Sequence, residues 1–257
     1  MTISILSIIL GLLLLALPAY LLLQLDQPLL LRSTRAVVRM MAQMAVLGGV
    51  LWALWYVDKL MVSLLWIVVT TVAAAWLLVK RTRLQQKQLF LPVWAGLLTG
   101  VLVVGGYLLL VLRLEQPLTA RWIVPVSGVL LAQILTTNTR GVSAYFEALR
   151  KDAQSYYTLL GNGASRLKAL TPYVRQALRS MMEPMMSSLA VTGLLALPML
   201  LAGLLMGGLS PVAASVLFVL LVVAGIAASV LALVTTLWLA DKQAFNKRGE
   251  LKDIFMS

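Results

Sequence analysis

The 257-residue chain contains no cysteine and no histidine, and only nine of its side chains are acidic. Without cysteine there are no disulfides and there is no thiol chemistry. Without histidine the chain lacks the commonest metal ligand and the commonest general base. We therefore expect no catalytic residues and no metal site, and most enzyme mechanisms that work inside membranes are excluded.

Two functional motifs are also absent. Residues 161–165 read Gly-Asn-Gly-Ala-Ser and lack the Gly-Lys-[Ser/Thr] ending of a phosphate-binding loop, so we expect no nucleotide to bind this chain. The last long apolar stretch, Val212 to Leu239, has no lysine that would form a retinal Schiff base. The sequence thus predicts a protein without a bound cofactor.

Apolar residues are abundant and make up 61% of the chain. They fall into seven runs, each close to the roughly 20 residues that a helix needs to cross about 30 Å of hydrocarbon. We predict an all-α integral membrane protein with seven transmembrane helices in a single domain over residues 1–257. The runs are Ile3 to Leu23, Val37 to Val57, Leu60 to Val79, Pro92 to Leu112, Trp122 to Thr139, Met186 to Gly208 and Val212 to Leu239.

Two pairs of glycines within the runs have the i, i+4 spacing that lets helices approach closely. They are Gly96 with Gly100 in the fourth run and Gly203 with Gly207 in the sixth. We interpret both pairs as packing positions.

Positive charge is distributed unevenly between the gaps. Of the 21 Lys and Arg residues, only Lys59, Arg113 and Arg121 lie in the gaps that follow the second, fourth and sixth runs. Cytoplasmic loops carry the excess of Lys and Arg, so the N-terminus is predicted outside and the C-terminus in the cytoplasm of a bacterial inner membrane. The net charge of +12 is explained by contact with anionic membrane lipid, and we expect no nucleic-acid partner.

The longest gap, from Arg140 to Met185, is predicted to fold. Apolar residues recur in it at helical spacing: Tyr156, Leu160, Leu167, Leu170, Val174 and Leu178. A basic face lies opposite them: Lys168, Arg175 and Arg179. The Gly-Asn-Gly at 161–163 predicts a tight turn between two helices. The pattern leaves two interpretations open, a helix that lies on lipid or a docking element for a cytoplasmic partner.

Several short stretches between Trp122 and Glu250 recur in one known family, in the same order. They are Val124 to Gly128, Gly163 to Ser165, Gly193 to Leu194, Leu197 to Pro198 and Gly208 to Ala213, with Ala169, Arg175, Arg179, Pro184 and Gly203. On these residues the chain resembles the permease subunits of the FetB-type ABC transporters, a family of bacterial iron-export and plant aluminium-tolerance permeases. It looks like a divergent member, because its first half agrees only in its spans and charge.

The resemblance implies a permease that works as a homodimer with two copies of a separate ATP-binding subunit, which would hold ATP and Mg²⁺. In that family the turn after the fifth span belongs to a coupling helix that engages the ATP-binding subunit, here within residues 147–180. By position, the contact would be made by Leu160, Gly163, Ala164, Ser165 and Arg166. The resemblance therefore favours docking over a helix that lies on lipid.

Few polar groups are expected at membrane depth. The candidates for a translocation path are Gln133, Asn138, Glu183, Ser187, Pro198 and Gly203. Three of them have a simpler interpretation: Gln133 and Asn138 as hydrogen-bonding groups at a helix end, and Glu183 as an acid favoured by a helix dipole. Residues 198–203 read Pro-Met-Leu-Leu-Ala-Gly where the family usually has Pro-Gly-Met-Met-[Ser/Thr]-Gly, and Ser187 stands where the family has an acidic residue. A more apolar path follows, which leaves the substrate, iron included, open.

Two other classes of function remain open from the residues alone. One is a secondary transporter or channel that works without ATP, against which no span holds a confident buried Asp, Glu or His for proton coupling. The other is a regulatory membrane subunit. An ATPase gene beside this one would discriminate between the three classes.

The charge pattern predicts the outcome of single-cysteine labelling in this naturally cysteine-free chain. Lys59→Cys should react with a membrane-impermeant thiol reagent added to intact cells, whereas Arg83→Cys should react only after the cells are opened. Labelling of Arg83→Cys from outside would overturn the predicted topology.

Overall fold

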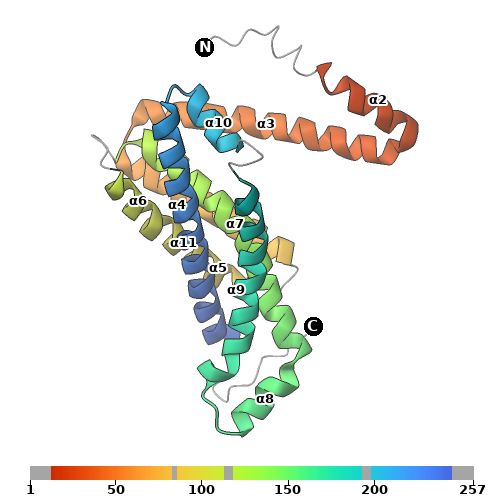
Figure 1. Ribbon diagram of the computed structural model, residues 1–257, viewed down its shortest axis with the longest axis vertical. Helices are drawn as coiled ribbons and strands as arrows, with labels where there is room; N and C mark the ends of the chain where they lie inside the picture. The colour runs from red at the N-terminus through yellow and green to blue at the C-terminus, as the bar shows by residue number, and fades with distance from the viewer. Residues whose placement is uncertain (1–12, 83–85, 113–117, 193–197, 245–257) are drawn as a thin grey trace. The chain divides into compact units, whose positions relative to one another are not determined.

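A computed structural model describes residues 13–82, 86–112, 118–192 and 198–244 (Figure 1). The described residues form helices and contain no β-strand, which confirms the all-α class. Their contacts divide the chain into two units, one ending at Val57 and one beginning at Asp58. The single-domain organisation stays a prediction. The first unit holds α2 (Ala16–Leu25) and α3 (Gln27–Val57).

The second unit contains the remaining helices. In chain order they are α4 (Leu60–Thr82), α5 (Gln86–Thr99), the π-helix η1 (Gly100–Val104), α6 (Gly105–Val111), α7 (Ala120–Lys151), α8 (Ala153–Gly161), α9 (Arg166–Val191), α10 (Met199–Met206) and α11 (Pro211–Ala244). Helices α5, η1 and α6 follow one another without a break and form one long helix that widens at η1.

Five helical stretches are long and apolar enough to cross a membrane. They are Gln27–Val57, Leu60–Thr82, Leu89–Val111, Ala120–Lys151 and Pro211–Lys242. These five coincide with the second, third, fourth, fifth and seventh predicted runs. A membrane protein with several spans is therefore confirmed, while the number seven and the direction of crossing stay predictions.

The other two runs are not seen as single spanning helices. The first begins within residues 1–12, which lie outside the described residues, and α2 that follows has 10 residues. The sixth is divided, because α9 ends at Val191 and a separate helix α10 begins at Met199. Thr192 and Pro198 at the two ends of the break are both extended, with ψ of 129° and 140°. Proline has no N–H for a helical hydrogen bond, so Pro198 starts a new helix rather than continuing α9.

The core of the second unit is a close contact between α5–η1 and α11. A Cβ placed on Gly96 would lie 2.1 Å from Thr236 Oγ1 and 2.6 Å from the Ala232 carbonyl oxygen. On Gly100 it would lie 2.8 Å from the Ala228 carbonyl oxygen. Small residues on both helices thus let the backbones touch, which is how helices associate in lipid. The predicted packing role of Gly96 and Gly100 is confirmed.

The second glycine pair behaves differently. A Cβ on Gly203 would meet nothing within 4 Å, and one on Gly207 would meet only backbone of its own helix. Within the described residues, this pair does not bring two helices together.

Helix α7 is fixed to α11 by buried polar side chains. Thr137 Oγ1 donates to Ser229 Oγ at 3.0 Å. In the amide orientation that satisfies both neighbours, Asn138 donates to the Ser229 carbonyl and accepts from the Leu233 N–H, each at 3.1 Å. At the start of α7, the Ala120 N–H donates to Asp58 Oδ1 at 2.8 Å, so that carboxylate satisfies an N–H left open at the helix end. The bonds between α7 and α11 satisfy polar groups that are buried away from water.

The contact at Gly96 predicts a selective loss of stability. Gly96→Ala forces α5 away from α11, and overpacking of this kind costs roughly 1–3 kcal/mol. Gly106→Ala is the matched control, because a Cβ there meets nothing within 4 Å and alanine favours a helix. Thermal unfolding of the purified proteins in detergent should show a lower Tm for Gly96→Ala only. Equal Tm values for the two variants would contradict the packing assignment.

Candidate functional site

The turn between α8 and α9 has a defined backbone geometry. The Gly163 N–H donates to the Leu160 carbonyl and the Ala164 N–H to the Leu159 carbonyl, both at 3.0 Å. Gly163 is left-handed, with φ of 84°. This is a Schellman motif, in which glycine ends a helix because it carries no Cβ to clash. The predicted helix, turn and returning helix are therefore confirmed.

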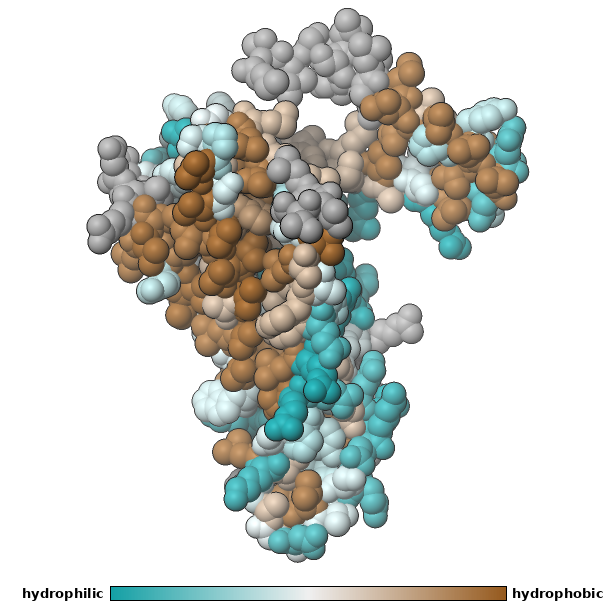
Figure 2. All heavy atoms as spheres, in the orientation of Figure 1, coloured by the Kyte–Doolittle hydropathy of each residue, from teal (hydrophilic) through white to brown (hydrophobic). Residues whose placement is uncertain are grey.

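The turn lies at one end of the second unit. Figure 1 shows α8 and the turn beyond the end of α11. In Figure 2 hydrophilic residues and a few apolar ones lie at this end, whereas a nearly continuous apolar face covers α6 and α11. The part of the unit that carries the turn is thus built to lie outside hydrocarbon.

The structure separates the five residues predicted to contact an ATP-binding subunit. Gly163 and Ser165 are exposed, Ala164 is half-buried, and Leu160 is half-buried against the core. Arg166 is half-buried and turns inward, where its guanidinium donates to the main-chain carbonyl of Asp241 in α11. An exposed surface of small residues therefore remains at the turn.

Two buried tyrosines support the helices around the turn. Tyr173 in α9 donates its hydroxyl to the Asp152 carbonyl at the end of α7, at 2.9 Å. Burial raises the pKa of Tyr173 above its ordinary value, so the phenol stays protonated as the donor. Tyr156 in α8 is buried, as its position in the predicted apolar face requires. Leu167, expected on the same face, is instead 76% exposed, because it lies in the first turn of α9 beside the loop rather than facing the core.

A polar groove lies between α7 and α9. It has a volume of about 210 Å³, and each helix contributes four residues to its lining. They are Gln133, Thr136, Thr137 and Arg140 from α7, and Met181, Pro184, Met185 and Ser188 from α9. Gln133 Nε2 lies 2.9 Å from Met185 Sδ and donates to it. Polar groups on a helix that crosses lipid need a protein or water neighbour, so this groove is the candidate translocation surface.

The groove continues toward the turn. A second hollow of about 450 Å³ shares Arg140 and Pro184 and adds Gln176, Arg179, Ser180 and Glu183. Arg179 and Glu183 form an ion pair at 3.6 Å, and both side chains are largely exposed, so the pair adds little stability. Figure 2 shows the corresponding band of hydrophilic residues along α9 beside the apolar face.

The six predicted path residues do not all meet in this groove. Gln133 and Glu183 line its two parts, and Ser187 is exposed on the adjoining turn of α9, where its hydroxyl donates to the Pro184 carbonyl at 2.9 Å. Asn138 is buried against α11 instead. Pro198 precedes α10 as its N-cap and Gly203 lies within it, and neither lines either hollow.

Arg140 also lines the groove, although it is not among the predicted path residues. Periodicity could have indicated it, because Gln133, Thr136 and Arg140 are spaced by three and four residues and so share one face of α7.

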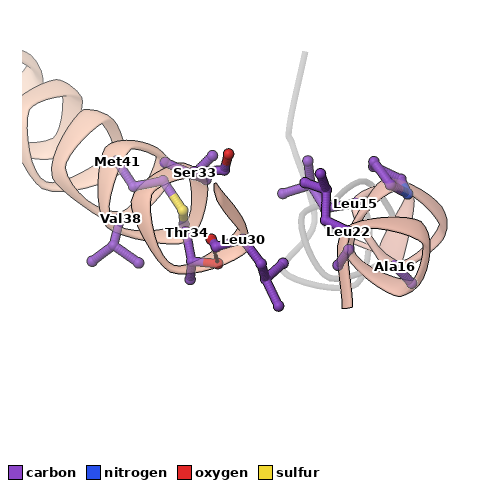
Figure 3. Close-up of a pocket in the computed structure, with 11 residues that line it drawn as sticks. Leu15, Ala16, Leu22, Leu30, Ser33, Thr34, Val38 and Met41 are labelled. Atoms are coloured by element: carbon purple, nitrogen blue, oxygen red, sulfur yellow. Dashed lines mark hydrogen bonds between the residues drawn. The ribbon is translucent and has the colours of Figure 1, made fainter. Parts of the chain in front are cut away.

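A separate pocket in the first unit has a different character. It lies between α2 and α3 and is lined mainly by apolar side chains such as Leu15, Leu22, Leu30, Val38 and Met41 (Figure 3). Of its two hydroxyl groups, Thr34 already donates to the Leu30 carbonyl at 2.9 Å. The pocket offers packing surface rather than chemistry. Within the part of the chain that the structure describes, no three acidic residues gather as metal ligands either.

Fold and site together define a helical integral membrane protein with a polar groove and a projecting helix–turn–helix. The chain belongs to the Uncharacterised protein family (UPF0014), whose model matches residues 3–245.

Several curated proteins are similar to the chain. The chain is 26% identical to the UPF0014 membrane protein slr1647 of Synechocystis over 83% of each chain. It is 22% identical to the probable iron export permease protein FetB of Escherichia coli, over 84% of this chain and 82% of that one. The protein ALUMINUM SENSITIVE 3 of Arabidopsis thaliana is 27% identical over 56% of this chain and 53% of its own. No solved structure matches the chain.

If the groove is open to water, cysteines placed in it will react faster with a hydrophilic thiol reagent than cysteines that face lipid. Thr136→Cys should react with a hydrophilic thiol reagent added to opened cells, since the reactive thiolate forms in water. Val223→Cys is a control on α11, exposed on the apolar face and within a span. Labelling rates measured by mass spectrometry should be much higher for Thr136→Cys, and equal rates would remove the groove from consideration.

Proposed function

We propose that this chain is the permease subunit of an ABC transporter, working as a homodimer with two copies of a separate ATP-binding subunit. The observation that carries the proposal is the projecting α8–α9 turn, with small exposed residues at its tip and a rigid Schellman geometry. Small residues permit close approach of a partner, and such a turn fits a groove on a cytoplasmic subunit. Membership of a family that includes a probable iron export permease supports it.

In this proposal the nucleotide chemistry takes place in the partner. ATP and Mg²⁺ are held by the ATP-binding subunits, whose closure draws the two turns of the permease dimer together. The movement alters access to the groove between α7 and α9 from one side of the membrane to the other, and release follows hydrolysis. The permease contributes binding surface and movement and performs no covalent step.

We further propose the topology that places the turn beside such a partner. The chain crosses a bacterial inner membrane seven times, with the N-terminus outside and the C-terminus in the cytoplasm, in contact with anionic lipid. The excess of Lys and Arg between Arg140 and Met185, the stretch that contains the turn, supports a cytoplasmic position for it.

The name of the Escherichia coli relative makes export of a metal such as iron the substrate class to test first. Two features of the groove bear on that test. Met181 and Met185 supply thioethers, which suit soft cations, and Glu183 supplies a carboxylate. Against them stand Arg140 and Arg179, which raise the positive potential where a cation would enter.

The docking surface is tested by adding bulk and charge at the turn without altering its backbone. Ala164→Arg is the sharper variant, because any substitution of Gly163 also strains a left-handed backbone. We expect Ala164→Arg to insert normally but to lose the ATP-binding subunit on co-purification, and with it transport and stimulated ATP hydrolysis. The parent complex should contain two copies of each subunit by light scattering.

Two further variants control this experiment. Thr171→Arg adds the same charge at an exposed position further along α9 and should keep the partner. Gly163→Trp should fail as Ala164→Arg does, whereas a helix lying on lipid would tolerate tryptophan at the interface. Retention of the partner and of full transport by Ala164→Arg would show that the turn is not the docking surface.

A further inference from the structure

Arg166, the first residue of α9, joins the turn to the far end of another helix. Its guanidinium donates to the main-chain carbonyl of Asp241, 75 residues away in sequence. Asp241 lies near the end of the described part of α11, Pro211–Ala244. Arg166 therefore ties the start of α9 to the backbone of α11.

The side chain of the same aspartate is held from a third helix. Tyr145 in α7 is fully buried, and its hydroxyl donates to Asp241 Oδ1 at 2.6 Å. Asp241 is thus bound through its main chain by α9 and through its carboxylate by α7. We call the three residues Tyr145, Arg166 and Asp241 the latch.

Helix α11 connects the latch to the polar groove. It is one helix of 34 residues whose only proline is its first residue, Pro211. At Gly225 it touches Gln133 of the groove, because a Cβ on Gly225 would lie 3.1 Å from Gln133 Cγ. From Asp241 to Gly225 the helix rises roughly 24 Å at 1.5 Å per residue. Helix α9 also runs from the turn to the groove. It contains Pro172 and Pro184, which interrupt its helical hydrogen bonds, so it is the less rigid of the two connections.

We propose that the latch transmits movement of the turn to α11 and through it to the groove. In this inference, which rests on the proposed function, Arg166 is a positioning residue and not a contact for the ATP-binding subunit. Coupling between two sites can be carried by a rigid secondary element, and the latch followed by α11 supplies one.

The test measures transport per ATP hydrolysed by the complete complex of permease and ATP-binding subunit in vesicles. Arg166→Gln removes the charge that reaches the Asp241 carbonyl, and Lys168→Gln removes a matched, exposed charge two residues further along α9. We expect Arg166→Gln to keep the ATP-binding subunit and to continue hydrolysing ATP, while transport per ATP falls about tenfold or more. Lys168→Gln should behave like the parent, and Arg166→Lys should recover part of the loss.

A covalent replacement provides a second measurement in case Arg166→Gln folds poorly. The chain has no cysteine, so Arg166→Cys with Asp241→Cys creates the only reactive pair. Before cross-linking, the double variant should hydrolyse ATP with little transport. Joining the two thiols with a short bifunctional reagent should restore transport per ATP. No restoration in a protein shown to be cross-linked would overturn the latch.

The remaining outcomes separate this inference from the proposed function. If Arg166→Gln loses the ATP-binding subunit, Arg166 is a docking contact, and the latch is wrong while the ABC assignment stands. If Arg166→Gln binds the subunit and transports as many molecules per ATP as the parent, the latch is again wrong. If the parent protein itself binds no ATP-binding subunit, the proposed function fails and the latch fails with it.

Discussion

The close contact of α5–η1 with α11 is the constraint on which the second unit depends. Lipid offers apolar side chains as good an environment as another helix does, so helices in a membrane associate through shape and hydrogen bonds. Gly96 and Gly100 provide the shape by bringing one backbone against Ala228, Ala232 and Thr236. Once α11 is fixed there, α7 packs on it through Thr137 and Asn138, and the α7–α9 groove follows from the position of α7.

The polar residues divide into those that hold helices together and those that face the groove. Asn138 bonds to the main chain of α11 through both amide atoms, and these bonds would be left unsatisfied if the helices separated. Thr137 belongs to both groups, because its hydroxyl lies within hydrogen-bonding distance of Ser229 and of the Gln133 carbonyl of its own helix, and it also lines the groove. Gln133 and Thr136 face the groove, where a thioether and solvent-accessible space meet them. Adjacent faces of one helix thus serve helix packing and the groove.

The sequence predicted best those features that depend on local chemistry. Five spans could be read from hydropathy because lipid requires long apolar helices, and the turn at Gly163 because a left-handed residue at a helix end favours glycine. The break before Pro198 was missed because an apolar run does not reveal whether its backbone is continuous. The same glycine spacing occurs at Gly96, where there is a tight helix contact, and at Gly203, where there is none. Spacing alone does not show whether a second helix packs there.

The direction of Arg166 shows why site residues are harder to predict than spans. A cation beside an exposed turn suggests contact with an acidic partner, and its neighbours in sequence give no reason to expect otherwise. Its acceptor is the main-chain carbonyl of Asp241, which lies within reach because α11 packs along α5 and passes beside the turn. The same dependence makes the residue informative, because movement of the turn would displace the helix to which Arg166 ties it. In the transporter proposed above, α11 therefore connects the docking turn, at Asp241, with the groove, at Gly225.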